Sequence, residues 1–167
     1  MSTLGHGRNV AIVAIAMLIV AFFIASPLIV NVTPSVPLGL YWRHHRAAVR
    51  GDFVLIALPP HLRTLAIDRD YLRHDHHLLK KVVAVGSDRV CRHGHSVWIN
   101  NHIRVWARRN DALGRALPAW FGCRGLTDDE LFILGTHPSS FDSRYFGPIL
   151  RSDVIAVANP LLVWQAD

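Results

Sequence analysis

The hydrophobic residues of this chain fall into one long run near its start and several short runs after it. Residues 10–30 contain no charged side chain, and about 20 apolar residues are what an α-helix needs to cross a bilayer. The pattern predicts a membrane-spanning helix over 10–30, preceded by a short segment, 1–9, and followed by one domain, 31–167. A cleaved signal peptide, cut between Ala21 and Ser26, is the alternative.

The short apolar runs after residue 31 have the turn signals that bound β-strands. Runs of apolar and β-branched residues that end at Gly, Pro, Asn or Asp are typical of strands, and they occur at 53–58, 78–85, 89–91, 96–99, 103–105, 130–135 and 153–157. Asn100 and Asn101 suit the tight turn of a hairpin. Residues 61–77 are polar and predict a solvated loop. With no convincing amphipathic helix after residue 30, the domain is predicted to be mainly β.

The charge balance shows that the protein is basic but does not identify the kind of partner that it binds. Lysine and arginine number 18 against 12 acidic residues, a net charge of +6, which suits an anionic membrane surface as well as nucleic acid. The arginines are scattered, without a motif that alternates basic and aromatic residues, so no nucleic-acid partner is expected. The patch of His74, Asp75, His76 and His77 lacks the spacing of metal ligands, so neither a metal nor a cofactor is predicted.

The two cysteines and the charges beside residues 10–30 give opposite indications about compartment. Cys91 and Cys123 form no CxxC and no zinc-ligand spacing. In an exported domain they would pair, stabilising the fold by roughly 3–4 kcal/mol, whereas in the cytosol they would stay thiols. Three arginines follow the span, which favours a cytoplasmic domain, although long domains cross membranes largely regardless of charge.

Ser35 and two adjacent lysines are the residues most suited to chemistry. Pro34 and Pro37 stiffen the segment around Ser35 and would present its hydroxyl close to the membrane surface. The simpler interpretation is that these prolines end a helix and begin a loop. Lys80 and Lys81 interrupt an apolar strand, where neighbouring side chains face opposite sides. Two lysines that protect a strand edge are the alternative there.

Four segments in order resemble the type I signal peptidase family of membrane-bound serine–lysine proteases. Thr33-Pro34-Ser35 is similar to its nucleophile box, and Gly51-Asp52-Phe53-Val54-Leu55 to its Gly-Asp strand. Leu79-Lys80-Lys81-Val82-Val83 through Asp88 is similar to its lysine box, and Asp142-Ser143-Arg144 to its last box. The segments from Asn31 to Tyr41 and from Leu117 to Arg124, with Cys91, resemble the TraF-like subgroup of conjugative transfer peptidases more closely still.

The resemblance implies a nucleophile and a base. Ser35 corresponds to the nucleophile, and register with the family selects Lys80 rather than Lys81 as the general base. A free lysine titrates near pH 10.4, but an apolar strand environment disfavours the ammonium ion and lowers that value. Despite eleven histidines, the family pattern has no histidine at an equivalent place, so no Ser-His-Asp triad is expected.

The resemblance also implies supporting roles around that pair. The Ser35 N–H and the Thr33 hydroxyl would stabilise the oxyanion, and Ser140 would orient the Lys80 amine. Asp142 and Arg144 would form an ion pair beneath the site, for which a purely structural salt bridge is the alternative.

A membrane-anchored serine endopeptidase is the function that the resemblance implies. Its β-rich catalytic domain would lie in the periplasm, held by one span in the bacterial inner membrane, with Cys91 and Cys123 in a disulfide. Its partner would be an exported, membrane-associated precursor such as a conjugative pilin, released as a linear or a cyclic product. The alternatives are a general signal peptidase and a non-catalytic component of a transfer channel.

Overall fold

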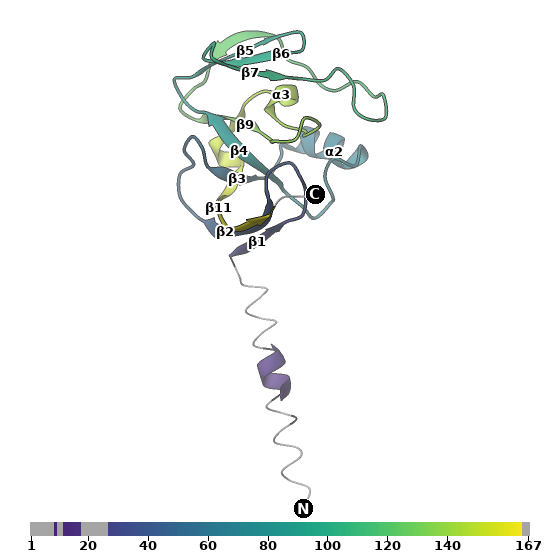
Figure 1. Ribbon diagram of the computed structural model, residues 1–167, viewed down its shortest axis with the longest axis vertical. Coiled ribbons are helices and arrows are strands. Elements are labelled where there is room, and N and C mark those ends of the chain that lie inside the picture. The colour runs from purple at the N-terminus through teal and green to yellow at the C-terminus, as the bar shows by residue number, and fades with distance from the viewer. Residues whose placement is uncertain (1–8, 10–11, 18–26, 165–167) are drawn as a thin grey trace, which may run out of the picture.

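The structure, a computed structural model, describes residue 9, residues 12–17 and residues 27–164. Residues 12–17 are helical, and the rest of the predicted span up to residue 26, with the alternative cleavage region, lies outside the described residues. Within the described ranges, no helix combines the length and the apolar character needed to cross a membrane. The remainder forms two antiparallel sheets (Figure 1).

The larger sheet has seven strands and carries most of the predicted apolar runs. In spatial order its strands are β1 (Leu28–Asn31), β2 (Leu38–His44), β11 (Val154–Trp164), β3 (Phe53–Ile56), β4 (Leu78–Ala84), β9 (Glu130–Leu134) and β10 (Ile149–Leu150). Strand β4 lies between β3 and β9, so the predicted lysine strand is central rather than at an edge. The mainly β prediction is confirmed.

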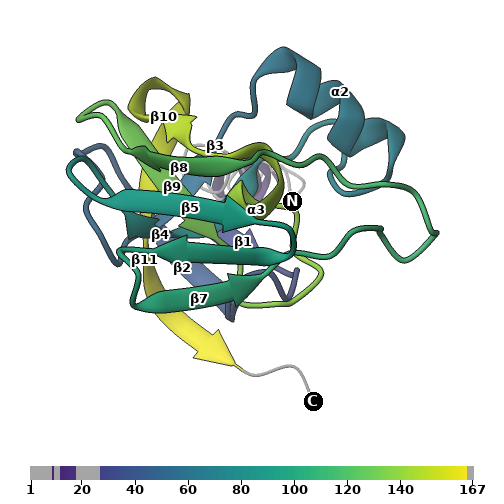
Figure 2. The same ribbon diagram turned by 90° about the horizontal axis from the view of Figure 1, so that it is seen from above.

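The smaller sheet has four strands and lies over β9 at the opposite end of the domain from β1 (Figures 1 and 2). Its spatial order is β7 (Ile103–Trp106), β6 (Ser96–Ile99), β5 (Arg89–His93) and β8 (Gly122–Gly125). Asn100 and Asn101 join β6 to β7 with φ of 51° and 58°, values that a tight primed turn requires. The predicted hairpin turn is therefore confirmed.

A helix corrects the prediction of a solvated loop over 61–77. Helix α2 (Pro60–Asp68) begins at a proline, which suits the first helical position because its missing N–H would be unpaired there. Three apolar residues at helical spacing, Leu62, Leu65 and Ala66, pack toward the core. The polar residues between them dilute that pattern in the sequence. The described domain also contains α3 (Ser143–Phe146) and the 3-10 turn η1 (Arg151–Asp153).

The boundaries of several strands also differ from the predictions. Leu28–Val30, placed at the end of the predicted span, belongs to β1 and pairs with β2. Hydropathy does not separate the end of an apolar helix from a short apolar strand that follows it. Strands β2 and β8 were not predicted, and β11 continues seven residues beyond Val157 to Trp164.

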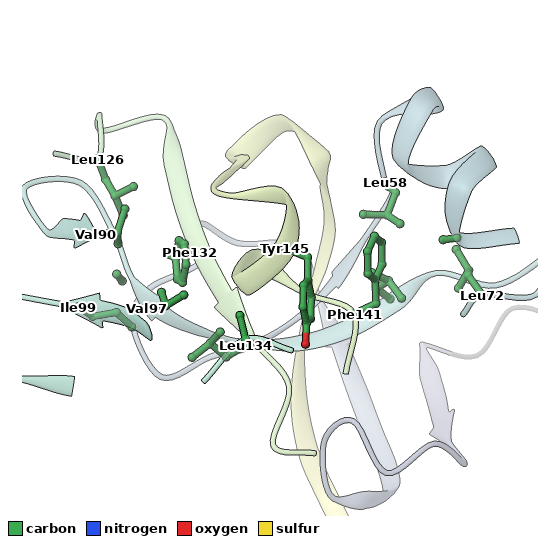
Figure 3. Packing of buried hydrophobic residues seen from close by; sticks show 14 residues of the cluster. Leu58, Leu72, Val90, Val97, Ile99, Leu126, Phe132, Leu134, Phe141 and Tyr145 are labelled. Atoms are coloured by element: carbon green, nitrogen blue, oxygen red, sulfur yellow. The ribbon is translucent and has the colours of Figure 1, made fainter. Parts of the chain in front are cut away.

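The principal core cluster joins the smaller sheet to the helices. Its side chains extend from β5 and β6, past β9 and α3, to α2 (Figure 3). Phe141 lies 5.1 Å from Tyr71 and 6.1 Å from Tyr145 between ring centroids. A second group, Val36, Tyr41, Leu79 and Ala158, packs beneath the β1–β2 connection. These contacts fix the segment around Ser35 on one side and the segment around Phe141 on the other.

Candidate active site

Ser35 lies on the connection between β1 and β2, above a buried apolar support. The side chains of Val36 and Tyr41 are 1% and 0% exposed, whereas Ser35 is partly exposed. The Ser35 carbonyl accepts a hydrogen bond of 2.7 Å from the backbone N–H of Thr136, which follows β9. The segment around Ser35 is therefore held by its own hairpin and by Thr136, about 100 residues later in the chain.

Asn31 organises this connection from the end of β1. Its amide nitrogen donates to the carbonyls of Thr33, Val36 and Pro37 at 2.9, 3.1 and 3.0 Å. Its amide oxygen accepts from the N–H and the hydroxyl of Thr33 at 3.2 and 3.0 Å. The Thr33 hydroxyl lies 3.3 Å from the Ser35 hydroxyl. One buried amide thus reaches residues on both sides of Ser35.

Lys80 and Lys81 face opposite sides of β4, as alternation along the strand predicts. Lys80 is 3% exposed, whereas Lys81 is exposed and its amine lies 5.9 Å from the centre of the Phe53 ring. Burial lowers the pKa of Lys80 to about 8. The Asp142 carboxylate opposes this pKa shift, and the Arg144 guanidinium adds to it. Near neutral pH a useful fraction of Lys80 is the neutral amine that a base must be.

Ser35, Lys80 and Ser140 line one groove of ≈ 470 Å³. One wall is residues 29–34 and another is 70–73 with 76–79, and the segment 137–141 without Pro138 completes it. Much of the lining is apolar, which suits an extended peptide more than a small polar ligand. His76 and His77, expected in a solvated loop, contribute to this lining.

Ser140 brings an unpaired hydroxyl to the groove. Its Oγ is buried and has no hydrogen-bond partner among the described residues, although buried hydroxyls are normally paired. Gly135 makes room for it, because a Cβ at that position would lie 2.5 Å from the Ser140 Cβ and 2.8 Å from the Ser35 carbonyl oxygen. The Ser140 hydroxyl is free to accept from or donate to an amine in the groove.

Asp142 and Arg144 form the expected ion pair beneath the segment that carries Ser140. Their closest N–O distance is 2.7 Å, and the side chains are 0% and 6% exposed. Asp142 also accepts from the Gly135 N–H at 2.8 Å. Arg144 donates to the carbonyls of His137, Pro138 and Ser140 at 3.1–3.2 Å. The pair therefore ties the end of β9 to the 137–140 loop.

Comparison with known proteins places this arrangement in a family. Residues 4–164 match the family described as signal peptidase, peptidase S26. The chain belongs to this family. It is 31% identical over 161 residues to a plasmid transfer protein TraF from Escherichia coli, covering 89% of this chain and 90% of that protein. A conjugal transfer protein TraF from Agrobacterium fabrum is 35% identical over 154 residues, covering 81% and 82%.

A solved structure gives a weaker likeness. A signal peptidase I from Enterococcus faecalis superimposes with a TM-score of 0.39 at 18% identity, covering 68% of this chain and 98% of that one.

The disulfide lies on the smaller sheet. Cys91 and Cys123 are directly paired residues of β5 and β8, and their sulfurs are bonded, as expected for an exported domain. His93 lies 3.7 Å from the Cys123 sulfur. The three side chains form a group whose ligand atoms lie within 4.8 Å of one another. Because metals bind thiolates, sulfurs joined in a disulfide do not supply that site.

The sequence predicted the side chains that the groove brings together but not all of the residues that support them. The groove brings together Ser35, Lys80 and Ser140, with Thr33 beside Ser35. Asn31, Gly135, Thr136 and Tyr41 were not predicted to act there. A glycine directly after an apolar strand was the one available signal for Gly135. Asn31 and Tyr41 make side-chain hydrogen bonds within the β1–β2 connection, and Thr136 contacts Ser35 from a distant segment.

Proposed function

We propose that this chain is a serine endopeptidase in which Ser35 is the nucleophile and Lys80 is the general base. The observation that carries the proposal is that Ser35 lines the same groove as a deeply buried lysine. A serine hydroxyl needs a base to remove its proton. A lysine with a pKa of about 8 can take up that proton, whereas an exposed lysine is almost wholly protonated near neutral pH.

The proposed reaction balances with these two residues. The proton of the Ser35 hydroxyl passes to the Lys80 amine as Oγ forms a bond to the substrate carbonyl carbon. The Lys80 ammonium then protonates the leaving amine as the peptide bond breaks, which leaves an ester on Ser35. Water that attacks this ester gives a linear product, and the substrate's own amino group gives a cyclic one.

The surroundings of Ser35 support stabilisation of the oxyanion. The Ser35 N–H has no acceptor among the described residues, so it is available to the developing negative charge. The Thr33 hydroxyl is the second candidate donor. In the free enzyme its proton lies on Asn31, so it must rotate to reach an oxyanion.

We further propose that the enzyme acts at a membrane on an exported precursor, such as a conjugative pilin. The disulfide suits the oxidising periplasm, and residues 10–30 have the composition of a single inner-membrane span. The relatives named for plasmid or conjugal transfer support a role in that process. The apolar groove suits a precursor segment in extended form.

The experiment that tests this function compares the precursor in cells with the wild-type chain and with Ser35→Ala. Mass spectrometry of the candidate pilin should show trimming with the wild-type chain and the intact precursor with the variant. A product lighter than the trimmed linear peptide by one water would identify cyclisation. Continued trimming with a folded Ser35→Ala variant would instead favour a non-catalytic role in the transfer apparatus.

A further inference from the structure

The buried side chain of Asn31 makes hydrogen bonds with three residues of the β1–β2 connection. It is 6% exposed, and its amide takes part in five hydrogen bonds with residues 33, 36 and 37. These residues bracket Ser35 without including it. The β1–β2 register, in which Asn31 pairs with Gly39, already closes the hairpin. The strand pairing alone would close the hairpin, so the hydrogen bonds of the Asn31 amide instead fix the backbone conformation of the residues between the two strands.

These hydrogen bonds also set the direction of the hydroxyl protons. The Asn31 amide oxygen has no proton to donate, so the single hydroxyl proton of Thr33 lies on their 3.0 Å contact. In the 3.3 Å contact between the two hydroxyls, Ser35 is consequently the donor and Thr33 the acceptor. A relay runs from Ser35 through Thr33 to Asn31, and it restricts rotation of the Ser35 side chain.

We propose that Asn31 is a positioning residue that fixes the place of the Ser35 Oγ in the groove that Ser35 shares with Lys80. The Ser35 proton, which lies on Thr33 in the free enzyme, turns to the Lys80 amine in the reaction. It acts through the Thr33 hydroxyl and through the carbonyls of Val36 and Pro37. The inference rests on the proposed Ser35–Lys80 pair and adds a third participant to it. Asn31 itself touches neither the substrate nor the Lys80 amine.

The opposing interpretation is that Asn31 only stabilises the fold. Tyr41 offers a matched comparison, because its buried hydroxyl donates to the same Pro37 carbonyl at 2.6 Å but, among the described residues, makes no hydrogen bond with Thr33 or Ser35. Removal of either side chain's hydrogen bonds should lower the melting temperature. Only removal of the Asn31 amide should disturb Ser35.

The test uses the full chain with Ser35→Cys as a chemical probe that requires no substrate. Since Cys91 and Cys123 are paired, the new thiol is the single free one. Its rate of alkylation by iodoacetamide, measured against pH, gives its pKa. A free cysteine titrates near pH 8.5, and a neighbouring ammonium ion lowers that value. Adding Lys80→Met should therefore raise the thiol pKa.

If Asn31 positions the nucleophile, Asn31→Ala in the Ser35→Cys chain should raise the thiol pKa in the same direction. A rise of one unit corresponds to about a tenfold loss of thiolate well below the pKa. With Lys80→Met already present, Asn31→Ala should add little further change. Thr33→Val, which removes only the hydroxyl relay, should reproduce much of the rise in thiol pKa. It also replaces Asn31→Ala in the test if that variant does not fold.

Tyr41→Phe is the control, expected to lower the melting temperature while it leaves the thiol pKa unchanged. The inference is overturned if Lys80→Met raises the thiol pKa but neither Asn31→Ala nor Thr33→Val does. If Lys80→Met itself has no effect, the Ser35–Lys80 pairing fails instead. The two failures are thus distinguished by one set of variants.

Discussion

At the scale of single residues, Lys80 is the proposed base, and among the described residues its buried amine has no hydrogen-bonded acid. If the neutral amine is the base, proteolytic activity should rise with pH and level off above about 8, the lowered pKa of Lys80. Precursor cleavage by the purified full chain, measured as kcat/KM across this range, checks the prediction. A rate that falls as pH rises through this range would contradict it.

Arginine substitutions separate a base from a positive charge at the same site. Lys80→Arg should be as inactive as Lys80→Ala, because a guanidinium ion stays protonated and accepts no proton. Lys81→Arg is the matched control and should keep most activity, since Lys81 faces away from the groove. Both variants can be compared in one precursor-cleavage assay. A nearly active Lys80→Arg chain would mean that the site needs charge alone.

Burial of Lys80 should also cost stability, and its pH dependence can be worked out. A fall in pKa from 10.5 to about 8 corresponds to about 3 kcal/mol. Between these values the unfolded chain binds the proton and the folded chain does not, so stability rises with pH. Below pH 8 both states carry the proton, and the full penalty applies.

Lys80→Met should therefore raise the free energy of unfolding at pH 7 by up to about 3 kcal/mol. The gain should shrink as pH rises from 8 toward 10.5. Urea unfolding at several pH values measures it. Lys81→Met, at an exposed position, should change little. An equal effect of the two substitutions would argue against burial of Lys80 as the cause.

At the scale of elements, Gly135 shows how β9 is fitted to the nucleophile. Alanine at this position would press on both Ser140 and the Ser35 carbonyl. Gly135→Ala should destabilise the chain by about 1–3 kcal/mol and reduce precursor cleavage at least about tenfold, a loss equal to 1.4 kcal/mol in the barrier. Gly125→Ala is the control, because a Cβ there meets no atom within 4 Å. Full activity of Gly135→Ala would contradict this close fit.

The sequence predicted elements well where local pattern decides the structure. Apolar runs bounded by turn residues located β3, β4, β6 and β9, and two asparagines located a hairpin turn. Strand β1 was missed because its apolar residues continue a longer apolar run. The polar residues of α2 hid its Leu62–Leu65–Ala66 spacing. Local pattern alone does not resolve either case.

In the candidate site, only residues that belong to a recognisable family motif could be predicted from the sequence. Ser35, Lys80 and Ser140 were identified through family resemblance, and the groove brings them together. Asn31 and Tyr41 belong to a segment of that resemblance, but their hydrogen bonds to carbonyls of the β1–β2 connection are not readable from a motif. The contact of Thr136 with Ser35 became visible only when the end of β9 was placed beside that connection.

At the scale of the whole molecule, exposed apolar side chains gather on β1, β2 and β11, which lie together at the end of the domain where β1 begins (Figure 1). The face spans three adjacent strands, because Val30 pairs with Leu40, and Leu40 pairs with Leu162. Val30 and Leu162 are 57% and 60% exposed. Trp42 on β2 and Trp164 on β11 are 39% and 44% exposed. Exposed apolar areas of this kind mark contact with a partner or a membrane.

If the enzyme works at a bilayer, this face should contact lipid while the smaller sheet stays in water. In vesicles with brominated acyl chains, tryptophan fluorescence of the full chain should be quenched. Trp42→Phe with Trp164→Phe should remove most of that quenching. Trp98→Phe with Trp106→Phe is the control on the smaller sheet, where Trp106 is 59% exposed but lies at the other end of the domain. Quenching that followed the control pair would place the smaller sheet against the membrane and reverse the proposed orientation.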